Sequence, residues 1–342
     1  MKHRFACWLG RGLFLAAWVA ASTFGARAAT QRACDIYSAA TPCVAAYSTT
    51  RALSSGYHGP LYQLTRLTDG AQKDVGLLPD GYADAAAQDA FCNHAPCAIT
   101  KLYDQTANHN DMVPAPRGGA AAGPYLNGYD LPAPARGVIV TVAGHKAYGI
   151  AIRPGMGYRI DHPKGTAVHG QPEGVYMVTS AIYLNNRCCF DFGNAESNDL
   201  DNNAGHMDAI NIKCKGTIPC GANAGLDMEN GIYGHLKVPD GTEFVTDMGA
   251  NDGQRSYAIY QGNAQSGTLT TTGPLPLPPG YAPMQQEGAI ILGIGGDNSN
   301  WASGYFFEGV MTKGMPTADT MQKVQQDIVA ARYAVWDVPY RH

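Results

Sequence analysis

Residues 136–143 read Arg-Gly-Val-Ile-Val-Thr-Val-Ala, and this run of β-branched side chains is typical of a β-strand. Three further short segments, 175–180, 287–292 and 305–311, have a similar β-branched and aromatic content. Glycine-containing turns separate these segments along the chain. A series of short strands joined by turns favours an all-β fold, and we expect a β-sandwich.

The composition agrees with a fold built from strands and turns. The chain has 342 residues, of which 41 are glycine and 21 are proline, and only 15% of the residues are charged. The apolar positions predict one clear helix at 317–335 and a shorter one at 84–91. The proline-rich stretch 273–280 is predicted to be a surface loop, because proline cannot donate to a sheet ladder. We find neither an internal repeat nor a linker, so residues 29–342 are expected to form one domain.

The first 28 residues have the pattern of a secretory signal peptide. Lys2, Arg4 and Arg11 precede or flank the start of an apolar run at 13–21, and Ala26-Arg27-Ala28 is an Ala-x-Ala cleavage site. The apolar run is shorter than the roughly 20 residues of a membrane-spanning helix, which disfavours the alternative of an anchor. The protein is therefore expected to be secreted, into either the periplasm or the extracellular space.

Charge gives a coarser set of expectations about partners. The formal net charge is −4, and the sequence contains no basic stripe. Nucleic acids and anionic membranes are therefore poor candidates as partners. We expect a monomer that needs no cofactor and no metal ion.

Cysteine usage also fits an exported protein. Cys7 lies in the signal peptide, and the other eight form four close couples, 34 with 43, 92 with 97, 188 with 189, and 214 with 220. An even number of cysteines in a secreted chain predicts disulfides, and we prefer these local pairings. The doublet is the unusual case, because adjacent Cα atoms lie about 3.8 Å apart across a trans peptide, below the usual disulfide range. Pairing of each cysteine of the doublet with a more distant partner stays open.

Two carboxylates stand close together in Asp227-Met228-Glu229. In a strand, alternation would direct both carboxylates to one face and Met228 into the core. Like charges that share a face can separate their pKa values, and a hydrogen bond from a protonated Asp227 or from Asn230 would orient Glu229. The alternative is a solvated acidic edge, which is the commoner role of an exposed carboxylate.

A second acidic residue, Asp297, lies in the segment 293–300, Gly-Ile-Gly-Gly-Asp-Asn-Ser-Asn. Its glycines would let a ligand approach the backbone, and its amides offer partners for hydroxyl groups. An Asx turn or a calcium loop is the alternative. The glycine spacing does not fit a dinucleotide fingerprint. Elsewhere, His206 is expected to have a structural or subsite role, and Glu308 is either a third active-site carboxylate or a surface residue at a strand end.

Several of these segments together resemble a known family. The resemblance runs from about residue 34 to residue 333, and its longest motifs are Cys188-Cys189-Phe190-Asp191-Phe192-Gly193-Asn194-Ala195-Glu196, Gly205-His206-Met207, Asp227-Met228-Glu229-Asn230 and the whole of 287–300. In these motifs the chain is similar to the catalytic domain of the α-L-arabinofuranosidase B family, glycoside hydrolase family 54.

The resemblance implies a concanavalin-like β-sandwich, or jelly roll, with the site on its concave face. It also implies a retaining exo-acting α-L-arabinofuranosidase that acts on arabinose-containing plant polysaccharides such as arabinan and arabinoxylan. Glu229 would be the nucleophile and Asp297 the general acid and base. The residues implied to line the arabinose pocket are Asp227, Asn230, Gly296 and a bridged Cys188-Cys189 pair.

Two departures from the family pattern affect these expectations. The stretch 210–226 lacks a pocket tryptophan and carries Cys214 and Cys220 instead, which leaves the substrate preference open. The C-terminal β-trefoil arabinose-binding module of the family is expected to be absent. A lectin-like sandwich that binds without cleaving, and a hydrolase of a different furanoside or of a β-linked glycan, stay as alternative functions.

Overall fold

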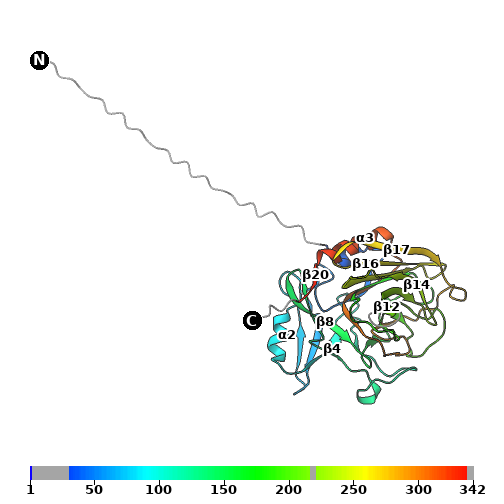
Figure 1. Cartoon of the computed structure of the whole chain (residues 1–342), viewed down its shortest axis with the longest axis horizontal. Helices are drawn as coiled ribbons and strands as arrows, with labels where there is room; N and C mark the ends of the chain where they lie inside the picture. Colours follow the sequence, from blue (N-terminus) through cyan, green and yellow to red (C-terminus); the bar gives the residue numbers. More distant parts are fainter. Residues whose placement is uncertain (2–30, 216–220, 337–342) are drawn as a thin grey trace. The chain divides into compact units, whose positions relative to one another are not determined.

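Two large antiparallel sheets and one small sheet carry the part of the chain that the computed structural model describes, which is Met1, residues 31–215 and residues 221–336 (Figure 1). The signal peptide predicted at residues 1–28 lies, apart from Met1, outside the described residues. The two large sheets pack face to face, and a continuous apolar core contains residues from both of them. The expected all-β sandwich is therefore confirmed, and the four strands predicted from the sequence are all present.

The strands fall into three sheets. In spatial order, the nine-stranded sheet contains β17 (Ser266–Pro276), β16 (Ser256–Asn263), β15 (Phe244–Asn251), β10 (Glu173–Ser180), β19 (Gly304–Lys313), β8 (His145–Ile152), β7 (Val138–Val142) and β20 (Tyr333–Val335), with β1 (Cys43–Ser48) paired to β19. The seven-stranded sheet contains β14 (Ile232–Lys237), β13 (Gly221–Asp227), β12 (Asp208–Lys215), β11 (Asp191–Ala195), β18 (Ala289–Leu292), β9 (Tyr158–Ile160) and β5 (Val113–Pro114). The small sheet contains β3 (Gln72–Val75), β2 (Tyr62–Arg66), β4 (Cys97–Leu102) and β6 (Ala133–Pro134).

Alternation along the seven-stranded sheet determines what its two faces carry. In β11, Phe192 points into the core between the sheets, whereas its neighbours Asp191 and Gly193 belong to the opposite, outer face. In β18, Ile290 and Leu292 enter the same core. The outer face has its own small cluster of apolar residues, Ala115, Ala195, Met207, Ala209, Ala289, Ile291 and Ile294. This cluster supports the candidate site described below.

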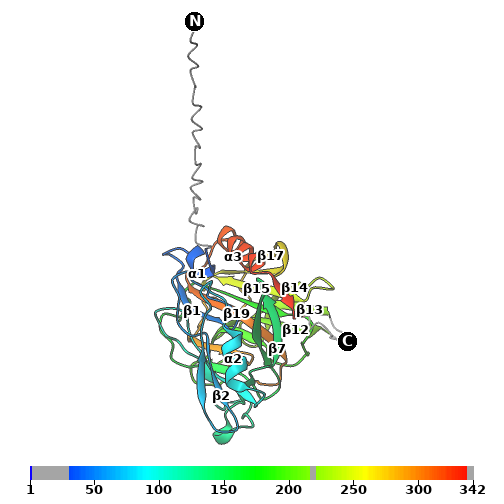
Figure 2. The ribbon, with the colours of Figure 1, turned by 90° about the vertical axis from the view of Figure 1, so that its left-hand side faces the viewer.

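Helices are few and short, with α1 (Ala33–Ile36), α2 (Ala85–Cys92), the 3₁₀ turn η1 (Leu126–Gly128) and α3 (Ala318–Ala330). The apolar residues of α3 pack against the outer face of the nine-stranded sheet (Figure 2). The hydroxyl of Thr317 caps α3 by accepting a hydrogen bond from the Thr320 amide at 3.2 Å.

The prediction of a helix through residue 335 is wrong at its end. Helix α3 stops at Ala330, Arg332 has a positive φ of 52°, and Tyr333–Val335 pairs with β7 as strand β20. Pairing with an existing sheet therefore determines the conformation of these last residues. The predicted loop 273–280 needs a similar correction, because its first four residues belong to β17, an exposed edge strand in which proline is tolerated.

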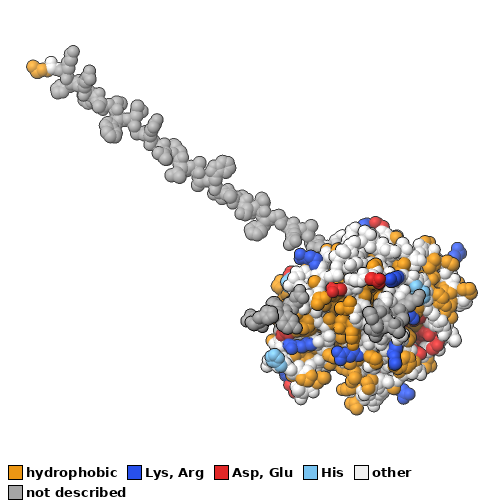
Figure 3. Space-filling view, viewed as in Figure 1, with side chains coloured by type: hydrophobic (Ala, Val, Ile, Leu, Met, Phe, Trp, Pro, Cys, Tyr) orange, Lys and Arg blue, Asp and Glu red, His pale blue; other side chains and the backbone are white. Residues whose placement is uncertain are grey.

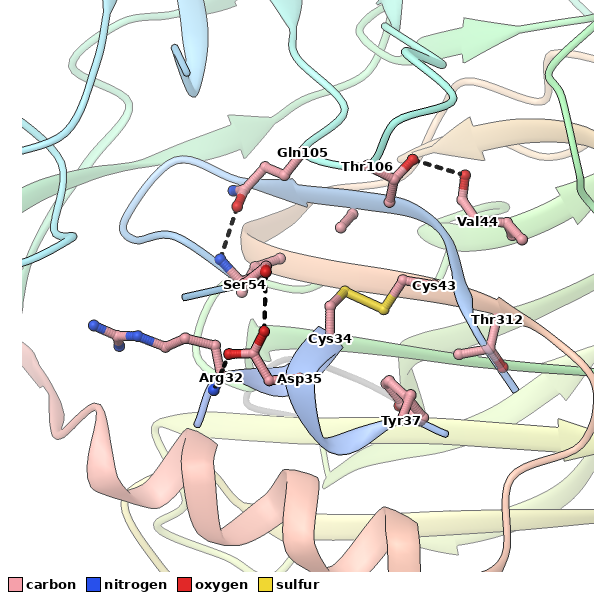
Figure 4. Close-up of a disulfide and its surroundings, with 12 residues drawn as sticks. Arg32, Cys34, Asp35, Tyr37, Cys43, Val44, Ser54, Gln105, Thr106 and Thr312 are labelled. Atoms are coloured by element: carbon pink, nitrogen blue, oxygen red, sulfur yellow. Dashed lines mark hydrogen bonds between the residues drawn. A yellow bond between two sulfur atoms is a disulfide. The ribbon is translucent and has the colours of Figure 1, made fainter. Parts of the chain in front are cut away.

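Three of the predicted local disulfides are confirmed, Cys34–Cys43, Cys92–Cys97 and Cys188–Cys189. Figure 4 shows the first, which joins α1 to the start of β1, next to Asp35, whose carboxylate accepts hydrogen bonds from the Arg32 amide and the Ser54 hydroxyl. The predicted pairing of Cys214 with Cys220 involves a residue outside the described part of the chain.

Charged groups on the surface show no gathering by sign on the face that Figure 3 displays, where lysine, arginine and carboxylate side chains are scattered among apolar and polar ones. Among the residues that the structure describes, no helix combines the length and the apolar character needed to cross a bilayer.

Candidate active site

A pocket of about 300 Å³ at the seven-stranded sheet brings together all seven residues predicted for the site. The residues that line it are Cys188, Cys189, Met207, Lys213, Asp227, Glu229, Asn230, Gly231, Ile232, Gly295, Gly296, Asp297 and Ser299. They come from four stretches of the sequence, 188–189, 207–213, 227–232 and 295–299, which the sheet places side by side. The chemistry of the pocket therefore depends on strand register and on the turns that follow the strands.

The floor of the pocket comes from strand alternation. Asp227 ends β13 opposite Ala209 of β12, while Leu226 on the other face of the strand enters the core. Asp191 of β11 lies on the same outer face, next to Asn211, whose side-chain amide donates a hydrogen bond to its carboxylate. The carboxyl group of Asp227 therefore lines the pocket, and a buried carboxylate oxygen of Asp191 lies within 4.8 Å of it.

Glu229 occupies a tight turn, and the prediction that it continues a strand with Asp227 is wrong. Strand β13 ends at Asp227, and both Glu229 and Asn230 have left-handed backbone conformations, with φ of 65° and 55°. Glutamate is rarely found there, and residues held in such conformations often cluster at functional sites. Met228 is fully buried, as predicted.

Hydrogen bonds hold this turn in place. The Glu229 amide donates to Asp227 Oδ1 at 3.1 Å, and the Tyr281 hydroxyl donates to the Glu229 carbonyl at 2.6 Å. The Asn230 amide donates to the Glu229 carboxylate. The carboxylate of Glu229 is thus directed by the backbone of its own turn.

Asp297 lies in an Asx turn on the other side of the pocket. Its Oδ1 accepts hydrogen bonds from the Ser299 amide at 3.0 Å and from the Ser299 hydroxyl at 2.5 Å. The Asp297 carbonyl accepts a hydrogen bond from the Ala120 amide at 3.0 Å, which ties this loop to the segment before η1. Among the described residues, the hydrogen bonds to this carboxylate all go to Oδ1.

The cysteine doublet lies beside this turn. Cys188 and Cys189 are bridged across a cis peptide, with their Cα atoms 2.9 Å apart, so the open alternative of distant partners is not what the structure has. The Cys189 amide donates to the Ser299 carbonyl, and the Trp301 amide donates to the Cys188 carbonyl, both at 3.1 Å. The bridge and the Asp297 turn therefore form one wall of the pocket.

Burial and mutual repulsion raise the pKa values of the carboxyl groups in the site. Burial, followed by the negative charge of Glu229, raises the pKa of Asp227 to about 7. Burial raises the pKa of Asp191 well above its usual range, with the charge of Asp227 as the next cause. Burial also raises the pKa of Glu229. A hydrogen bond from the side chain of Glu196 to the Glu229 carboxylate opposes this rise. Such shifted carboxyl groups in one cleft are typical of acid and base catalysis.

One trio near the pocket has the residue types of a metal site. A sulfur atom of Cys189 and carboxylate oxygens of Asp191 and Asp227 lie within 4.8 Å of one another. The Cys189 sulfur belongs to the disulfide, so it is not a thiolate and does not fit a metal ligand. The donor set that remains is a pair of buried carboxyl groups whose raised pKa values favour their neutral forms.

Two other residues considered from the sequence lie elsewhere. His206 pairs with Glu287, with His206 Nδ1 2.8 Å from Glu287 Oε1, which agrees with a structural role. Glu308 is neither an active-site carboxylate nor a surface residue, because it is fully buried next to Arg51. Both Glu308 alternatives are therefore wrong, since the β19 side chain points into the packing beneath α3.

Lys213, Gly231 and Ile232 also line the pocket and are not predicted from the sequence, and Met207 stands in the sequence only as part of the motif 205–207. The positive charge of Lys213 lowers the pKa of Asp227 and of Asp191, in opposition to burial. Alternation from Ile212, a core residue of β12, would have placed Lys213 on the outer face. Glu196 is the last residue of the motif 188–196, and no pattern in the sequence predicts its contact with Glu229.

Comparison with known proteins gives consistent matches. Residues 33–334 match the family model described as "Alpha-L-arabinofuranosidase B, catalytic". The chain is 49% identical over 317 residues to an "Alpha-L-arabinofuranosidase" of Hypocrea jecorina and 49% identical over 317 residues to an "Arabinofuranosidase/B-xylosidase" of Trichoderma koningii. Each match covers 88% of this chain and 63% of the relative, so the chain spans less than two thirds of the relatives' length.

A solved structure gives the same result at the level of the fold. It is a crystal structure of an arabinofuranosidase complexed with arabinofuranosyl-α-1,2-xylobiose, which this chain matches with a TM-score of 0.85 at 45% identity. The match covers 90% of this chain and 66% of that one.

Proposed function

The chain belongs to the α-L-arabinofuranosidase B family, glycoside hydrolase family 54, and from this premise we propose that it is a retaining α-L-arabinofuranosidase. It removes terminal non-reducing α-L-arabinofuranosyl units. The observation that carries the proposal is the presence of Glu229 and Asp297 in one small pocket, on separate turns. A retaining glycosidase needs such a pair, with the two carboxyl groups about 5 to 5.5 Å apart.

In the first step the Glu229 carboxylate attacks the anomeric carbon. The bond from that carbon to the leaving oxygen breaks, and Asp297 gives its proton to the oxygen. The product of this step is a covalent arabinosyl-enzyme. Its ester bond joins the anomeric carbon to a Glu229 carboxylate oxygen.

In the second step Asp297, now ionised, takes a proton from a water molecule that attacks the same carbon. The bond to Glu229 breaks, and arabinose leaves with the configuration it had in the substrate. Two inversions in sequence give this retention.

The remaining predicted residues hold the sugar. Asp227 and Asn230 offer polar groups to its hydroxyls, and the backbone at Gly296 offers close approach. The Cys188–Cys189 bridge presents a sulfur surface to an apolar face of the ring.

Arabinan and arabinoxylan side chains are the proposed natural substrates. The solved relative contains an arabinofuranosyl unit on xylobiose, which has the linkage type of an arabinoxylan side chain. A hydrolase that also accepts a β-xyloside is the second candidate, because the name of the Trichoderma koningii relative includes that activity. A lectin-like role fits less well, since binding alone does not need both carboxylates.

The proposed place of action is outside the cytoplasm, and the proposed state is a monomer. The signal-peptide pattern of residues 1–28 supports export. The three disulfides in the described residues fit an oxidising compartment.

The proposal is tested by release of 4-nitrophenol from 4-nitrophenyl α-L-arabinofuranoside. Wild type should turn over, and Glu229→Gln should be inactive because its amide is not a nucleophile. Glu243→Gln is the control, since Glu243 lines a separate pocket, and it should keep full activity. The β-D-xylopyranoside is assayed in parallel. A folded wild type that cleaves only the xyloside, or neither substrate, contradicts the proposal.

A further inference from the structure

Glu196, which follows β11, interacts with Glu229. It is fully buried and does not line the pocket, so it has no access to substrate. Its side chain is in hydrogen-bonding contact with the side chain of Glu229. Its carboxyl group fills the space next to Gly296, where an added Cβ would lie 2.9 Å from Glu196 Cδ and closer still to Oε2.

The backbone around Glu196 is held by Arg159, a fully buried residue of β9. Arg159 Nη1 donates to the Gly296 carbonyl at 2.6 Å, and Nη2 donates to the Glu196 carbonyl. Arg159 Nε also lies 2.6 Å from the Asp199 carboxylate. One guanidinium therefore connects the Glu196 segment with the loop that precedes Asp297, which holds the backbone on both sides of the Glu196 carboxyl group.

Two carboxyl groups in hydrogen-bonding contact require a proton between them, because two negative charges at that distance repel strongly in a buried site. Within the described residues, no other residue donates a hydrogen bond to either carboxyl oxygen of Glu196. An ionised Glu196 would therefore be a buried charge compensated only by its own backbone amide, which is costly. Glu229, in contrast, faces the pocket and accepts a hydrogen bond from the Asn230 amide.

We propose that Glu196 is a positioning residue that stays neutral, donates its carboxyl proton in a hydrogen bond to Glu229, and aligns that carboxylate for attack. This inference rests on the proposed function, in which Glu229 is the nucleophile. Glu196 touches neither substrate nor the reacting carbon, and its proton stays on Glu196 throughout the reaction. Neutral carboxylic acids that donate hydrogen bonds within an active site are a known use of burial.

The groups around Glu196 support a neutral carboxyl. Burial first, and then the negative charges of Glu229 and Glu287, raise the pKa of Glu196 to about 9. The positive charge of Arg159 is directed at the backbone carbonyls and at the carboxylates of Asp161 and Asp199. In return, the hydrogen bond from Glu196 lowers the pKa of Glu229 against the effect of burial. The loss of this bond should therefore move ionisation of Glu229 to higher pH.

The test compares Glu196→Gln, whose amide can still donate, with Glu196→Leu, which cannot. Both are assayed with 4-nitrophenyl α-L-arabinofuranoside over a range of pH. We expect Glu196→Leu to lower kcat by about 10- to 100-fold, the effect of one lost hydrogen bond to a charged group. Its KM should stay within about 3-fold of wild type, because Glu196 has no contact with substrate. The acid limb of kcat/KM should move to higher pH.

Glu196→Gln should keep kcat within a few-fold of wild type and leave the acid limb in place. Its activity should also fall less at alkaline pH, because wild type loses activity as Glu196 ionises near pH 9 and glutamine does not ionise. If both variants lose kcat equally and the acid limb of the kcat/KM profile does not move, Glu196 has a merely structural role and the proposal is overturned. If Glu196→Leu does not fold, the alkaline limb of the pH profile of Glu196→Gln decides whether the proposal stands.

A second readout does not depend on turnover. The infrared difference spectrum between wild type and Glu196→Gln at neutral pH should contain the C=O stretch of a protonated carboxyl group. Its absence would overturn the proposal even in an active enzyme. An inactive wild type that shows this band would instead refute the proposed function and leave the protonation of Glu196 standing.

Discussion

Replacement of Glu308 by glutamine should destabilise the protein without affecting catalysis. Glu308 accepts four hydrogen bonds, from Arg51 Nε at 2.6 Å, Arg51 Nη2 at 2.7 Å, the Tyr333 hydroxyl at 2.7 Å and the Tyr176 hydroxyl at 3.2 Å. Arg51 also contacts Asp327, with Nη2 2.9 Å from Oδ2. In Glu308→Gln, an amide NH₂ would face at least one of these donors, and the buried guanidinium would lose half of its compensating charge.

The cost follows from burial, since the side chains of Arg51 and Glu308 are both fully buried. Removal of one partner from a buried ion pair costs about 3 to 5 kcal/mol. In a domain of about 300 residues, each kcal/mol lowers Tm by about 2 °C, so the expected decrease is about 6 to 10 °C. Because the network lies beneath α3 and away from the pocket, kcat/KM well below Tm should equal that of wild type.

Thermal unfolding followed by circular dichroism measures this effect. Lys323→Gln serves as the matched control, because it breaks an ion pair on α3 whose Lys323 and Asp319 side chains are 58% and 75% exposed. Such exposed pairs contribute little, and Tm should change by about 1 °C or less. An unchanged Tm in Glu308→Gln together with a loss of kcat would refute the reasoning and return Glu308 to the active site.

Three further changes have defined outcomes. Asp297→Asn should reduce activity far more on natural oligosaccharides than on activated aryl arabinofuranosides, and equal losses on both would count against its role as the acid. Gly296→Ala should lower the free energy of unfolding in urea by about 1 to 3 kcal/mol and should lower kcat, because the added Cβ collides with Glu196. Gly76→Ala is the control, since no atom lies within 4 Å of its added Cβ, and it should change neither quantity. Burial raises the pKa of Asp208 to about 7. Because the folded state holds this proton more tightly than the unfolded state, the free energy of unfolding falls as pH rises through 7. In Asp208→Asn, which has no such proton, the urea midpoint should decrease less between pH 5 and 8 than in wild type.

The strands that build the sandwich could be predicted because their sequences carry the signal locally. The Val-Ile-Val-Thr-Val run became β7, and the β-branched segment 287–292 became β18 between the core and the pocket. The end of α3 could not be predicted, because residues 333–335 keep apolar positions at helical spacing. Their pairing with β7, a distant segment, determines the outcome.

The identities of the site residues came from motifs, whereas their geometry did not. Strand alternation correctly buried Met228 but gave the wrong conformation for Glu229, since nothing in the sequence indicates a glutamate with positive φ. The contact of Glu196 with Glu229 joins the residue that follows β11 to the turn that follows β13, and it depends on the register of the whole sheet. Such contacts need the tertiary structure.

The most direct test of the central claim is to trap the covalent intermediate in Asp297→Asn with 4-nitrophenyl α-L-arabinofuranoside. Without its base, this variant should form the arabinosyl-enzyme and hydrolyse it slowly, so the intermediate should accumulate. Peptide mass spectrometry after an acid quench should then find one added arabinosyl unit on Glu229. An adduct on a different residue, or first-formed arabinose of inverted anomeric configuration by NMR in the wild type, would contradict the account.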